Sequence, residues 1–406
     1  MTHACRFCKS TKLHLILDLG TAPPSNAFLT ADQLDEAETY YPLRLFFCED
    51  CALVQLPEYK KATEIFKDDY PYYSSRSPSN VSHAKEYCDM MCERFGYGPG
   101  SRVLEIGSND GYLLKYFKEK GSYVIGFEPS SGPAQEAEKI GIQTYKMFFD
   151  SRAGSHIGAT ADLICGINVL AHQPDINDFV AGLKIALAPG GVVNMEFPHL
   201  MRLIDECQFD TVYHEHYSYF SFTTICKIFQ KHGLEVFDVD EIPEHGGSLR
   251  IYARHDTGMA IWAGKVGRLM MTEAGRGMGK VEYYKDFQLR ADTIKRDLVG
   301  FLVDRETWGL NTVAYGSAAK GNTLLNFCGI RADLIDFVVD RSPHKIGKFL
   351  PGSRIPVVSE EAIRELKPAY ILILPWNLKN EIMEQLSYVR EWGCKLVVAI
   401  PRLEVL

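Results

Sequence analysis

Acid, base and phenol side chains are concentrated between residues 210 and 221. Tyr213, His214, Glu215 and His216 supply four candidates for proton transfer in consecutive positions. The two histidines are too close in sequence to share one helical face, as H-E-x-x-H zinc helices require, so no catalytic metal is predicted here. In an extended conformation, Tyr213, Glu215 and Tyr217 would share one face and the histidines the other, so one strand or loop could offer a base and a polarising group to a cleft. Buried hydrogen bonding without catalysis is the alternative.

Four of the eleven cysteines form two CxxC pairs, Cys5 with Cys8 and Cys48 with Cys51. Two residues between thiolates let a tight turn aim both sulfurs at one point, and two such pairs complete a tetrahedral zinc shell. A closed shell of four thiolates leaves no open coordination position, so we expect structural rather than catalytic zinc. Four buried free cysteines or a redox pair are the alternatives, which the second CxxC pair disfavours.

A glycine-rich turn follows an apolar run at residues 102–106. Gly107 and Gly111 flank this turn, and an amphipathic stretch begins directly after it. In a doubly wound sheet, ligands bind outside the carboxyl end of such a strand. The dinucleotide fingerprint is not matched, because its second glycine is missing and Glu105 lies inside the strand. Glu128 ends the next apolar run, where a carboxylate can accept both hydroxyls of a ribose.

The elements that must position these residues alternate along the chain. From about residue 70 to 255, apolar β-branched runs alternate with amphipathic stretches, which predicts an α/β domain with a mostly parallel sheet. The runs expected to be strands are 102–106, 124–128, 162–167 and 192–197. Helical spacing from Tyr284 to Phe301 predicts a connecting helix. Beyond it, a second, smaller doubly wound domain is expected, with strands at 312–315, 334–340, 370–375 and 395–400 and helices at 360–366 and 378–392. The expected domains are 1–65, 66–280 and 281–406.

Charge and composition exclude several classes of protein. The 406 residues include 44 Lys and Arg against 52 Asp and Glu, a formal charge of −8. Without blocks of Lys or Arg, we expect neither nucleic acid nor a membrane surface as a partner. The first residues contain no apolar signal segment, so a cytoplasmic protein is expected.

The order of strand, E-x-G-x-x-x-G turn, helix, strand and acid resembles that of the Rossmann-like (class I) S-adenosylmethionine (SAM) methyltransferases. The resemblance implies SAM as cofactor. It also implies a cofactor pocket that contains Glu105, Gly107, Asn109, Gly111, Glu128, Pro129, Phe148, Asn168, Ala171 and His172. Superfamily members often pack an aromatic residue against adenine at the position of Phe148, although a simple core pair of Phe148 with Phe149 is the alternative.

A narrower resemblance rests on the four-cysteine zinc module and on the motifs EIGSNDG, YHEHYSYFS, HGGSLR and AYGSAAKGNTLLN taken together. Over essentially the full chain, they resemble the nucleotide-sugar C-methyltransferase family, which methylates nucleoside-diphosphate 4-keto-6-deoxyhexoses, typically at C3, in branched deoxysugar biosynthesis. The resemblance implies a general base at His216, a catalytic segment with Tyr213 and Glu215, and a tyrosine of the pair Tyr72 and Tyr73 closing over the site.

The reaction of that family suits these residues. A proton on the carbon beside a ketone becomes acidic once the carbonyl oxygen is stabilised, so an imidazole can remove it while hydrogen-bond donors hold the enolate. We expect His216 to be the base, Tyr213 and His245 to lie near the oxyanion, and Glu215 to bind or orient a sugar hydroxyl.

A glycine-flanked turn at residues 315–323 precedes an expected helix in the C-terminal domain. Helix N-termini with a nearby lysine favour anions, so the diphosphate of a nucleotide-sugar is the expected ligand. Lys320 and Asn322 are the first candidates, and Asp340 and Lys345 are further candidates for contacts with the nucleoside or diphosphate. A domain retained only for packing is the alternative.

Two other functions remain open from the sequence. A sugar O- or N-methyltransferase needs the same cofactor pocket but no base for a carbon acid, whereas a nucleotide-sugar-binding scaffold would hold an inactive methyltransferase core. We expect a monomer or a weak dimer.

Overall fold

The computed structural model of the chain describes residues 3–66, 72–258 and 264–406. The chain forms two compact units, and each combines segments that are distant in sequence. The first unit comprises Met1–His14, Phe47–Leu200 and Tyr217–Lys280, and the second comprises Leu15–Phe46, Met201–His216 and Val281–Leu406.

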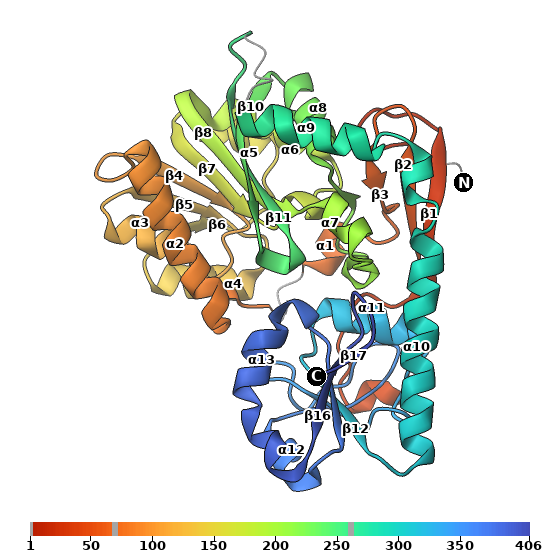
Figure 1. Cartoon of the computed structure of the whole chain (residues 1–406). Helices are drawn as coiled ribbons and strands as arrows, with labels where there is room; N and C mark the ends of the chain where they lie inside the picture. The colour runs from red at the N-terminus through yellow and green to blue at the C-terminus, as the bar shows by residue number, and fades with distance from the viewer. Residues whose placement is uncertain (1–2, 67–71, 259–263) are drawn as a thin grey trace. The chain divides into compact units, whose positions relative to one another are not determined.

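A seven-stranded sheet organises the first unit, in the order β10-β11-β8-β7-β4-β5-β6 (Figure 1). Its strands are β4 (Arg102–Ile106), β5 (Tyr123–Phe127), β6 (Gln143–Tyr145), β7 (Ala161–Ile167), β8 (Leu187–Pro198), β10 (Leu234–Ile242) and β11 (Ser248–His255). Neighbours are parallel, except that β11 is antiparallel to both β8 and β10. The four strands expected in this region are confirmed. The chain runs outward from β4 to β6 and returns at β7, so the order reverses beside β4, where ligands bind in open α/β sheets.

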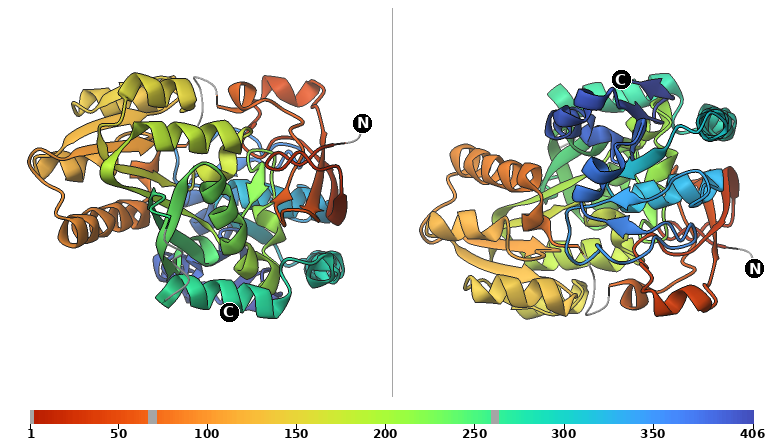
Figure 2. Two further views of the ribbon diagram at one scale, coloured as in Figure 1. Left: turned by 90° about the horizontal axis from the view of Figure 1, so that it is seen from above. Right: turned by 90° about the horizontal axis from the view of Figure 1, so that it is seen from below.

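Helices cover both faces of this sheet (Figure 2). Alternate residues of β4 explain this arrangement, because Val103 belongs to one apolar cluster and Leu104 to the other. The first cluster includes residues of α2 (Pro78–Phe95), α3 (Leu114–Glu119) and α4 (Ser131–Lys139). The second includes residues of α5 (Ser151–Ile157), α6 (Ile176–Ala186), α8 (Phe222–Lys231) and α9 (Gly264–Arg276). This is a Rossmann-like sheet, as expected.

A smaller four-stranded sheet has the order β1-β2-β3-β9. Its strands are β1 (Leu13–Ala22), β2 (Tyr41–Cys48), β3 (Val54–Gln55) and β9 (Ser218–Tyr219), and the short helix α1 (Ala62–Ile65) follows β3. Each CxxC pair adjoins this sheet: Cys5 and Cys8 precede β1, and Cys48 ends β2.

The second unit contains a six-stranded sheet in the order β14-β13-β12-β15-β16-β17. Its strands are β12 (Thr312–Tyr315), β13 (Val338–Val339), β14 (Val357–Val358), β15 (Tyr370–Ile373), β16 (Lys395–Val398) and β17 (Glu404–Val405). The pairs are parallel except for β16 with β17. Its helices are α7 (Leu200–Asp205), α10 (Phe287–Thr307), α11 (Ala319–Cys328), α12 (Glu361–Leu366) and α13 (Lys379–Gln385). The expected second doubly wound sheet is therefore present.

Two expected elements of this unit are shorter than their sequence patterns. The run 334–340 contributes only β13, because the carbonyl of Arg331 accepts hydrogen bonds from the N–H groups of Leu334 and Ile335 and closes a turn. The run 378–392 contains α13 and then a 3-10 stretch at Ser387–Trp392. In that stretch, the Tyr388 hydroxyl donates to Glu360, a tertiary contact that the local sequence pattern does not contain.

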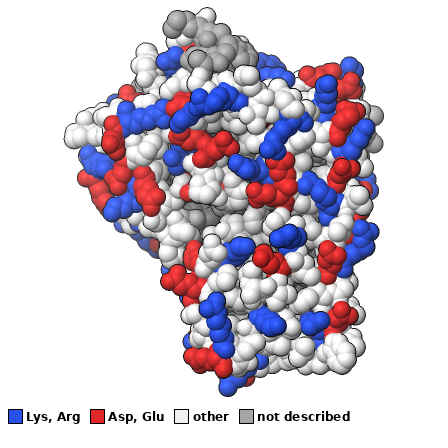
Figure 3. Space-filling model, viewed as in Figure 1, with Lys and Arg blue, Asp and Glu red and all other residues white. Residues whose placement is uncertain are grey.

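No helix within the described ranges is long and apolar enough to cross a membrane. On the face drawn in Figure 3, Lys and Arg side chains are interspersed with Asp and Glu.

Candidate active site

The four paired cysteines form a metal-binding cluster in the first unit. Their sulfur atoms all lie within 4.8 Å of one another, with Cys5 to Cys51 and Cys8 to Cys48 both at 3.5 Å. A tetrahedral zinc shell with Zn–S bonds of about 2.3 Å would separate its sulfurs by about 3.8 Å. The donor atoms and their spacing therefore fit the expected zinc. Each pair is shaped by the same local turn, in which the N–H of Lys9 or Ala52 donates to the carbonyl of the first cysteine.

The glycine turn after β4 has the backbone that its residues predict. Gly107 and Gly111 have φ of +68° and +77°, which glycine adopts without strain. A Cβ on Gly107 would lie 3.2 Å from the side chain of Val169, so the turn packs closely against the segment that follows β7.

Asn109 in this turn holds a neighbouring segment. Its Oδ1 accepts a hydrogen bond from the Ser74 N–H at 2.8 Å, and its Nδ2 donates to the Tyr72 carbonyl at 3.2 Å. The structure thereby brings the Tyr72 and Tyr73 pair beside the glycine turn. Tyr72 is 45% exposed, and its hydroxyl accepts a hydrogen bond from Asn80, whereas Tyr73 is half-buried.

Glu128 clamps the turn to the end of β5. Its two carboxylate oxygens accept hydrogen bonds from the N–H groups of Asn109 and Ser130, at 3.1 and 2.8 Å. Burial raises the pKa of Glu128, although these hydrogen bonds oppose the shift. Each oxygen retains a second lone pair, so the carboxylate can still accept a ligand hydroxyl. Pro129 follows directly.

Glu105 is fully buried in β4, and neither of its carboxyl oxygens has a hydrogen-bond partner. Burial, reinforced by the charges of Asp110 and Glu128, raises its pKa well above the usual range. An orphaned buried carboxyl calls for a partner that the protein itself does not supply. This feature fits a polar ligand such as SAM at the carboxyl edge of the sheet.

The segment after β7 contains three of the expected cofactor residues. Asn168 has φ of +56°, its N–H donates to the Glu196 carbonyl at 2.8 Å, and its buried Oδ1 has no partner. Ala171 accepts a hydrogen bond through its carbonyl from the Tyr217 N–H at 2.7 Å. His172 ends a single 3-10 turn.

Phe66 links two of the predicted residues, and sequence reasoning missed it. Its ring meets those of His172 and Phe148 edge-on, with centroids 5.3 and 6.2 Å apart. Phe149, by contrast, is buried in the core against Phe127. No local pattern distinguishes Phe66 from other aromatic residues, so the sequence offers no signal for it.

Sequence reasoning also missed a buried charged network. Glu196 near the end of β8 accepts hydrogen bonds from Arg250 Nε at 2.6 Å and pairs with His83 Nε2 at 2.7 Å. Burial raises the pKa of Glu196, but His83 and Arg250 lower it more, so the net shift is downward. A glutamate inside an otherwise apolar strand run was a usable signal for this network.

The segment that was expected to be catalytic, residues 213–216, lies in the second unit, and it is not extended. The N–H of His216 donates to the Tyr213 carbonyl at 2.9 Å, and their rings pack with centroids 4.0 Å apart. The expected placement of Tyr213 and His216 on opposite faces is therefore wrong, because a turn at residues 214–215 reverses the alternation.

The contacts of this turn separate the roles of its side chains. His216 Nδ1 donates to the Thr211 carbonyl at 3.2 Å, so in the neutral ring Nε2 carries the basic lone pair. Glu215 is buried and accepts a hydrogen bond from Asn26 Nδ2 at 2.8 Å. His214 Nε2 donates to the carbonyls of Tyr41 and Pro42, which anchors the turn.

Residues from the C-terminal part of the chain also hold this turn. Thr323 Oγ1 donates to the Val212 carbonyl at 3.0 Å, and Trp376 Nε1 donates to Asp210 Oδ2 at 2.8 Å. Burial raises the pKa of Asp210 to about 6, although Lys320 and Trp376 oppose the shift.

The two first candidates for anion binding, Lys320 and Asn322, have different surroundings. Lys320 Nζ donates to Asn377 Oδ1 at 2.7 Å and lies 4.9 Å from the centre of the Trp376 ring. Burial lowers the Lys320 pKa, which Asp210 opposes. Asn322 is 1% exposed, and its Nδ2 donates to the Ser25 carbonyl at 2.6 Å, so this side chain holds the N-terminal segment.

Asp340 and Lys345 meet at the turn after β12. Asp340 accepts hydrogen bonds from Ser317 N and Oγ at 2.9 and 2.6 Å, and Lys345 Nζ lies 3.5 Å from its carboxylate. Burial raises the pKa of Asp340, but Lys345 and these hydrogen bonds lower it more. His245 belongs to the first unit, where it is half-buried just before β11 with φ of +56°.

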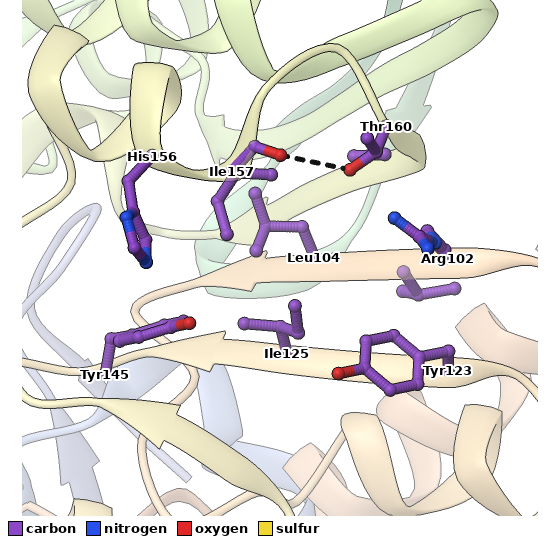
Figure 4. Close-up of a pocket in the computed structure, with 10 residues that line it drawn as sticks. Arg102, Leu104, Tyr123, Ile125, Tyr145, His156, Ile157 and Thr160 are labelled. Carbon is purple, nitrogen blue, oxygen red and sulfur yellow. Dashed lines mark hydrogen bonds between the residues drawn. The ribbon is translucent and has the colours of Figure 1, made fainter.

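A cavity of about 220 Å³ lies elsewhere in the first unit (Figure 4). It is lined by the first residues of β4 and β5, Arg102 and Tyr123, and by His156 and Ile157 of α5. The glycine turn follows the opposite, carboxyl end of β4, so this cavity is separate from the candidate site.

Three protein-family models match successive parts of the chain. They are "Putative zinc binding domain" over residues 5–66, "Methyltransferase domain" over residues 81–239, and "C-methyltransferase C-terminal domain" over residues 243–401.

Individual proteins match over different lengths. C-methyltransferase NovU of Streptomyces niveus is 33% identical over 99% of this chain and 96% of its own length. Ubiquinone biosynthesis O-methyltransferase of Rhizobium etli is 27% identical over 26% of this chain and 47% of its own length. Among solved structures, an S-adenosylmethionine dependent methyltransferase from Mesorhizobium loti aligns at 16% identity with a TM-score of 0.37, over 43% of this chain and all of its own.

Proposed function

The chain belongs to the C-methyltransferase family, and from this premise we propose that it methylates C3, the carbon next to the ketone, of a nucleoside-diphosphate 4-keto-6-deoxy sugar. That it is a SAM-dependent C-methyltransferase follows from the full-length relative and the matching methyltransferase domain. The sugar substrate and its branched deoxysugar pathway are the proposed refinement.

The buried turn Tyr213–His216 is the observation that carries this proposal. Methyl transfer to carbon needs a base, because a carbon acid must lose its proton before it can attack. His216 donates its Nδ1 proton to the Thr211 carbonyl, so the tautomer with the basic lone pair on Nε2 is the one proposed to take the C3 proton. The packed Tyr213 ring restricts the orientation of the imidazole.

The other groups of the site have distinct parts in this mechanism. Tyr213 and His245 are assigned to the carbonyl oxygen, where charge develops as the proton leaves. Glu215 is oriented by Asn26 and is assigned to a sugar hydroxyl. When bound at the glycine turn, SAM supplies an electrophilic methyl group. The C3–H electron pair would form the new carbon–methyl bond as the methyl–sulfur bond breaks with its electron pair left on sulfur, and His216 would keep the proton.

The nucleotide part of the substrate is assigned to the turn that opens α11. Lys320 provides a cation beside the first turn of a ten-residue helix, and the partial positive charge there adds to it. This turn belongs to the same compact unit as His216, and Trp376 and Asp210 connect the two. One unit therefore contains both the proposed diphosphate site and the proposed base.

Incubation with methyl-deuterated SAM and a panel of nucleoside-diphosphate 4-keto-6-deoxyhexoses tests the function. We expect mass spectrometry and NMR to find the label on carbon, with loss of the original C3 proton. A label on oxygen or nitrogen would favour a sugar O- or N-methyltransferase instead. No transfer to any sugar, with SAM bound, would reject this substrate class.

A further inference from the structure

Arg6 stands between two of the zinc ligands, but its side chain bonds to other parts of the first unit. Its two terminal nitrogens donate to the Pro174 carbonyl at 2.8 Å and the Leu56 carbonyl at 2.5 Å. Its guanidinium carbon lies 5.3 Å from the centre of the Tyr217 ring. A planar guanidinium can reach two carbonyls at once, whereas a lysine ammonium provides a single point of charge.

Arg6 is half-buried, and a charged side chain that is partly removed from water needs partners of its own. Its Nε has no hydrogen-bond partner. A closed shell of four cysteines does not itself require this cation, because the thiolates complete the zinc coordination.

The carbonyl of Pro174 terminates the segment that follows β7. This segment, residues 168–174, contains Asn168, Ala171 and His172, which are assigned to the cofactor. Tyr217 holds the same segment at a second point, since its N–H donates to the Ala171 carbonyl at 2.7 Å. Arg6 and Tyr217 are therefore in contact with each other, and each holds a different point of the cofactor segment.

The backbone around Arg6 is fixed to the next helix as well. Asn177 in the first turn of α6 donates through Nδ2 to the carbonyls of Arg6 and Phe7, each at 3.1 Å. Any shift of the Cys5–Cys8 turn would therefore move the guanidinium relative to Pro174.

We propose that Arg6 is a positioning residue through which the zinc-binding turn fixes the segment 168–174 in its SAM-binding conformation. The proposal rests on the assignment of that segment to the cofactor, and it is independent of the sugar substrate. Because coupling between two bound groups is reciprocal, bound cofactor should also stabilise the zinc-binding turn.

The test measures the affinity of full-length zinc-loaded protein for S-adenosylhomocysteine by calorimetry. Arg6→Lys retains a cation but loses the double hydrogen bond, and we expect its Kd to rise about 5- to 50-fold with zinc content unchanged. Lys12→Met is the matched control, because Lys12 is an exposed cation of the same module paired with Asp50. Its Kd should stay within about twofold.

A second variant distinguishes positioning from general destabilisation. Asn177→Ala removes the hydrogen bonds to the Arg6 and Phe7 carbonyls without touching the guanidinium, and it should also weaken binding of S-adenosylhomocysteine. In the Arg6→Lys background, however, it should cause little further loss, because the connection is already broken. The proposal would be overturned if the affinity losses of the two single variants multiplied in the double variant. Unchanged affinity in Arg6→Lys, or loss of its zinc, would overturn it as well.

Glu128→Ala separates this proposal from the assignment of the cofactor site. If this variant binds S-adenosylhomocysteine as the wild type does, the cofactor assignment itself is wrong. If Glu128→Ala binds weakly while Arg6→Lys binds normally, only the role of Arg6 is rejected.

Discussion

His216 is the residue on which the proposed chemistry depends most directly. Replacement by Asn preserves a donor toward the Thr211 carbonyl but removes the basic nitrogen. We expect His216→Asn to lower the exchange of the C3 proton with solvent deuterium, measured by NMR with S-adenosylhomocysteine present, by at least about 10³-fold. Cofactor affinity should change less than about twofold, because the expected cofactor residues lie in the other unit.

His214 provides the control for that substitution. It is buried in the same turn, yet its Nε2 is held by the Tyr41 and Pro42 carbonyls. His214→Asn should therefore lower the stability of the fold while retaining measurable exchange at C3. Loss of exchange in His214→Asn together with full exchange in His216→Asn would reverse the assignment of the base.

The raised pKa of Asp210 predicts how the stability of the fold depends on pH. Its folded pKa of about 6 lies above the ordinary value of 3.8, so between these values the folded state binds more protons than the unfolded state. The free energy of unfolding of the wild type therefore falls as pH rises through this range. Asp210→Asn has no carboxyl group to ionise, so it does not show this fall. From pH 5 to pH 7, the difference in free energy of unfolding between the variant and the wild type should shift by about 1 kcal/mol in favour of the variant.

Urea denaturation at several pH values, with zinc held constant, measures this difference. The gain should occur mainly below pH 6 and level off by about pH 7, where the carboxyl group is ionised in both states. A difference that does not change with pH would show that Asp210 is not held in its neutral form by burial.

At the scale of elements, the N-terminus of α8 depends on a carboxylate from α9. Glu273 accepts hydrogen bonds from the N–H groups of Phe222 and Thr223 and pairs with His199 at 2.7 Å. Glu273→Gln removes a negative charge from a helix N-terminus and leaves a buried amide with unmatched donors. We expect it to lower the free energy of unfolding by about 1 to 3 kcal/mol.

An exposed glutamate is the control for this substitution. Glu136 forms an i,i+3 pair with Lys139 on the surface of α4. Glu136→Gln should change the free energy of unfolding by less than about 0.5 kcal/mol in the same urea experiment. Equal effects of the two substitutions would indicate that Glu273 does not stabilise α8.

Local sequence patterns predicted the secondary-structure elements better than the tertiary contacts that these elements make. The run 102–106 and the glycines after it give strand β4 and its turn, because both depend on burial and backbone freedom within a few residues. The turn at 214–215 was not predicted, since alternation along 213–217 assumes extended backbone. Its conformation depends on Asn26, Thr323 and Trp376, which are far away in sequence.

The same limit applies to the candidate site. Cys5 and Cys48 could be grouped from the sequence because spacing within each CxxC carries the information. Phe66 and Arg6 could not be recognised, because their importance lies in contacts with His172 and Pro174. Asn322 has the residue type of an anion ligand, but its contact with the Ser25 carbonyl is a tertiary feature.

For the whole molecule, the proposed catalytic turn belongs to a unit assembled from three separate segments of the chain. Phe209 packs against Phe327, and Asp210 and Val212 bond to Trp376 and Thr323. A chain that ends at Lys280 lacks all three of these partners. We expect its peptides covering residues 209–216 to exchange amide hydrogens at least about 100-fold faster than in the full chain.

Hydrogen exchange followed by mass spectrometry measures this effect. Peptides from β4 and β7, which belong to the first unit, provide the internal reference. If residues 209–216 remain as protected in the shortened chain as in the full one, their order does not depend on the C-terminal sheet.

Because the segments of the second unit are far apart in sequence, the ribosome synthesises them at different times. Trp376 is translated 160 residues after His216, which takes roughly 8 to 32 seconds at ordinary elongation rates. During that interval, the residues expected to bind SAM are already made, but the proposed base still lacks its contacts with the C-terminal part of its unit. A nascent chain should therefore be able to bind SAM before the proposed catalytic turn is ordered, so that activity appears only when translation is nearly finished.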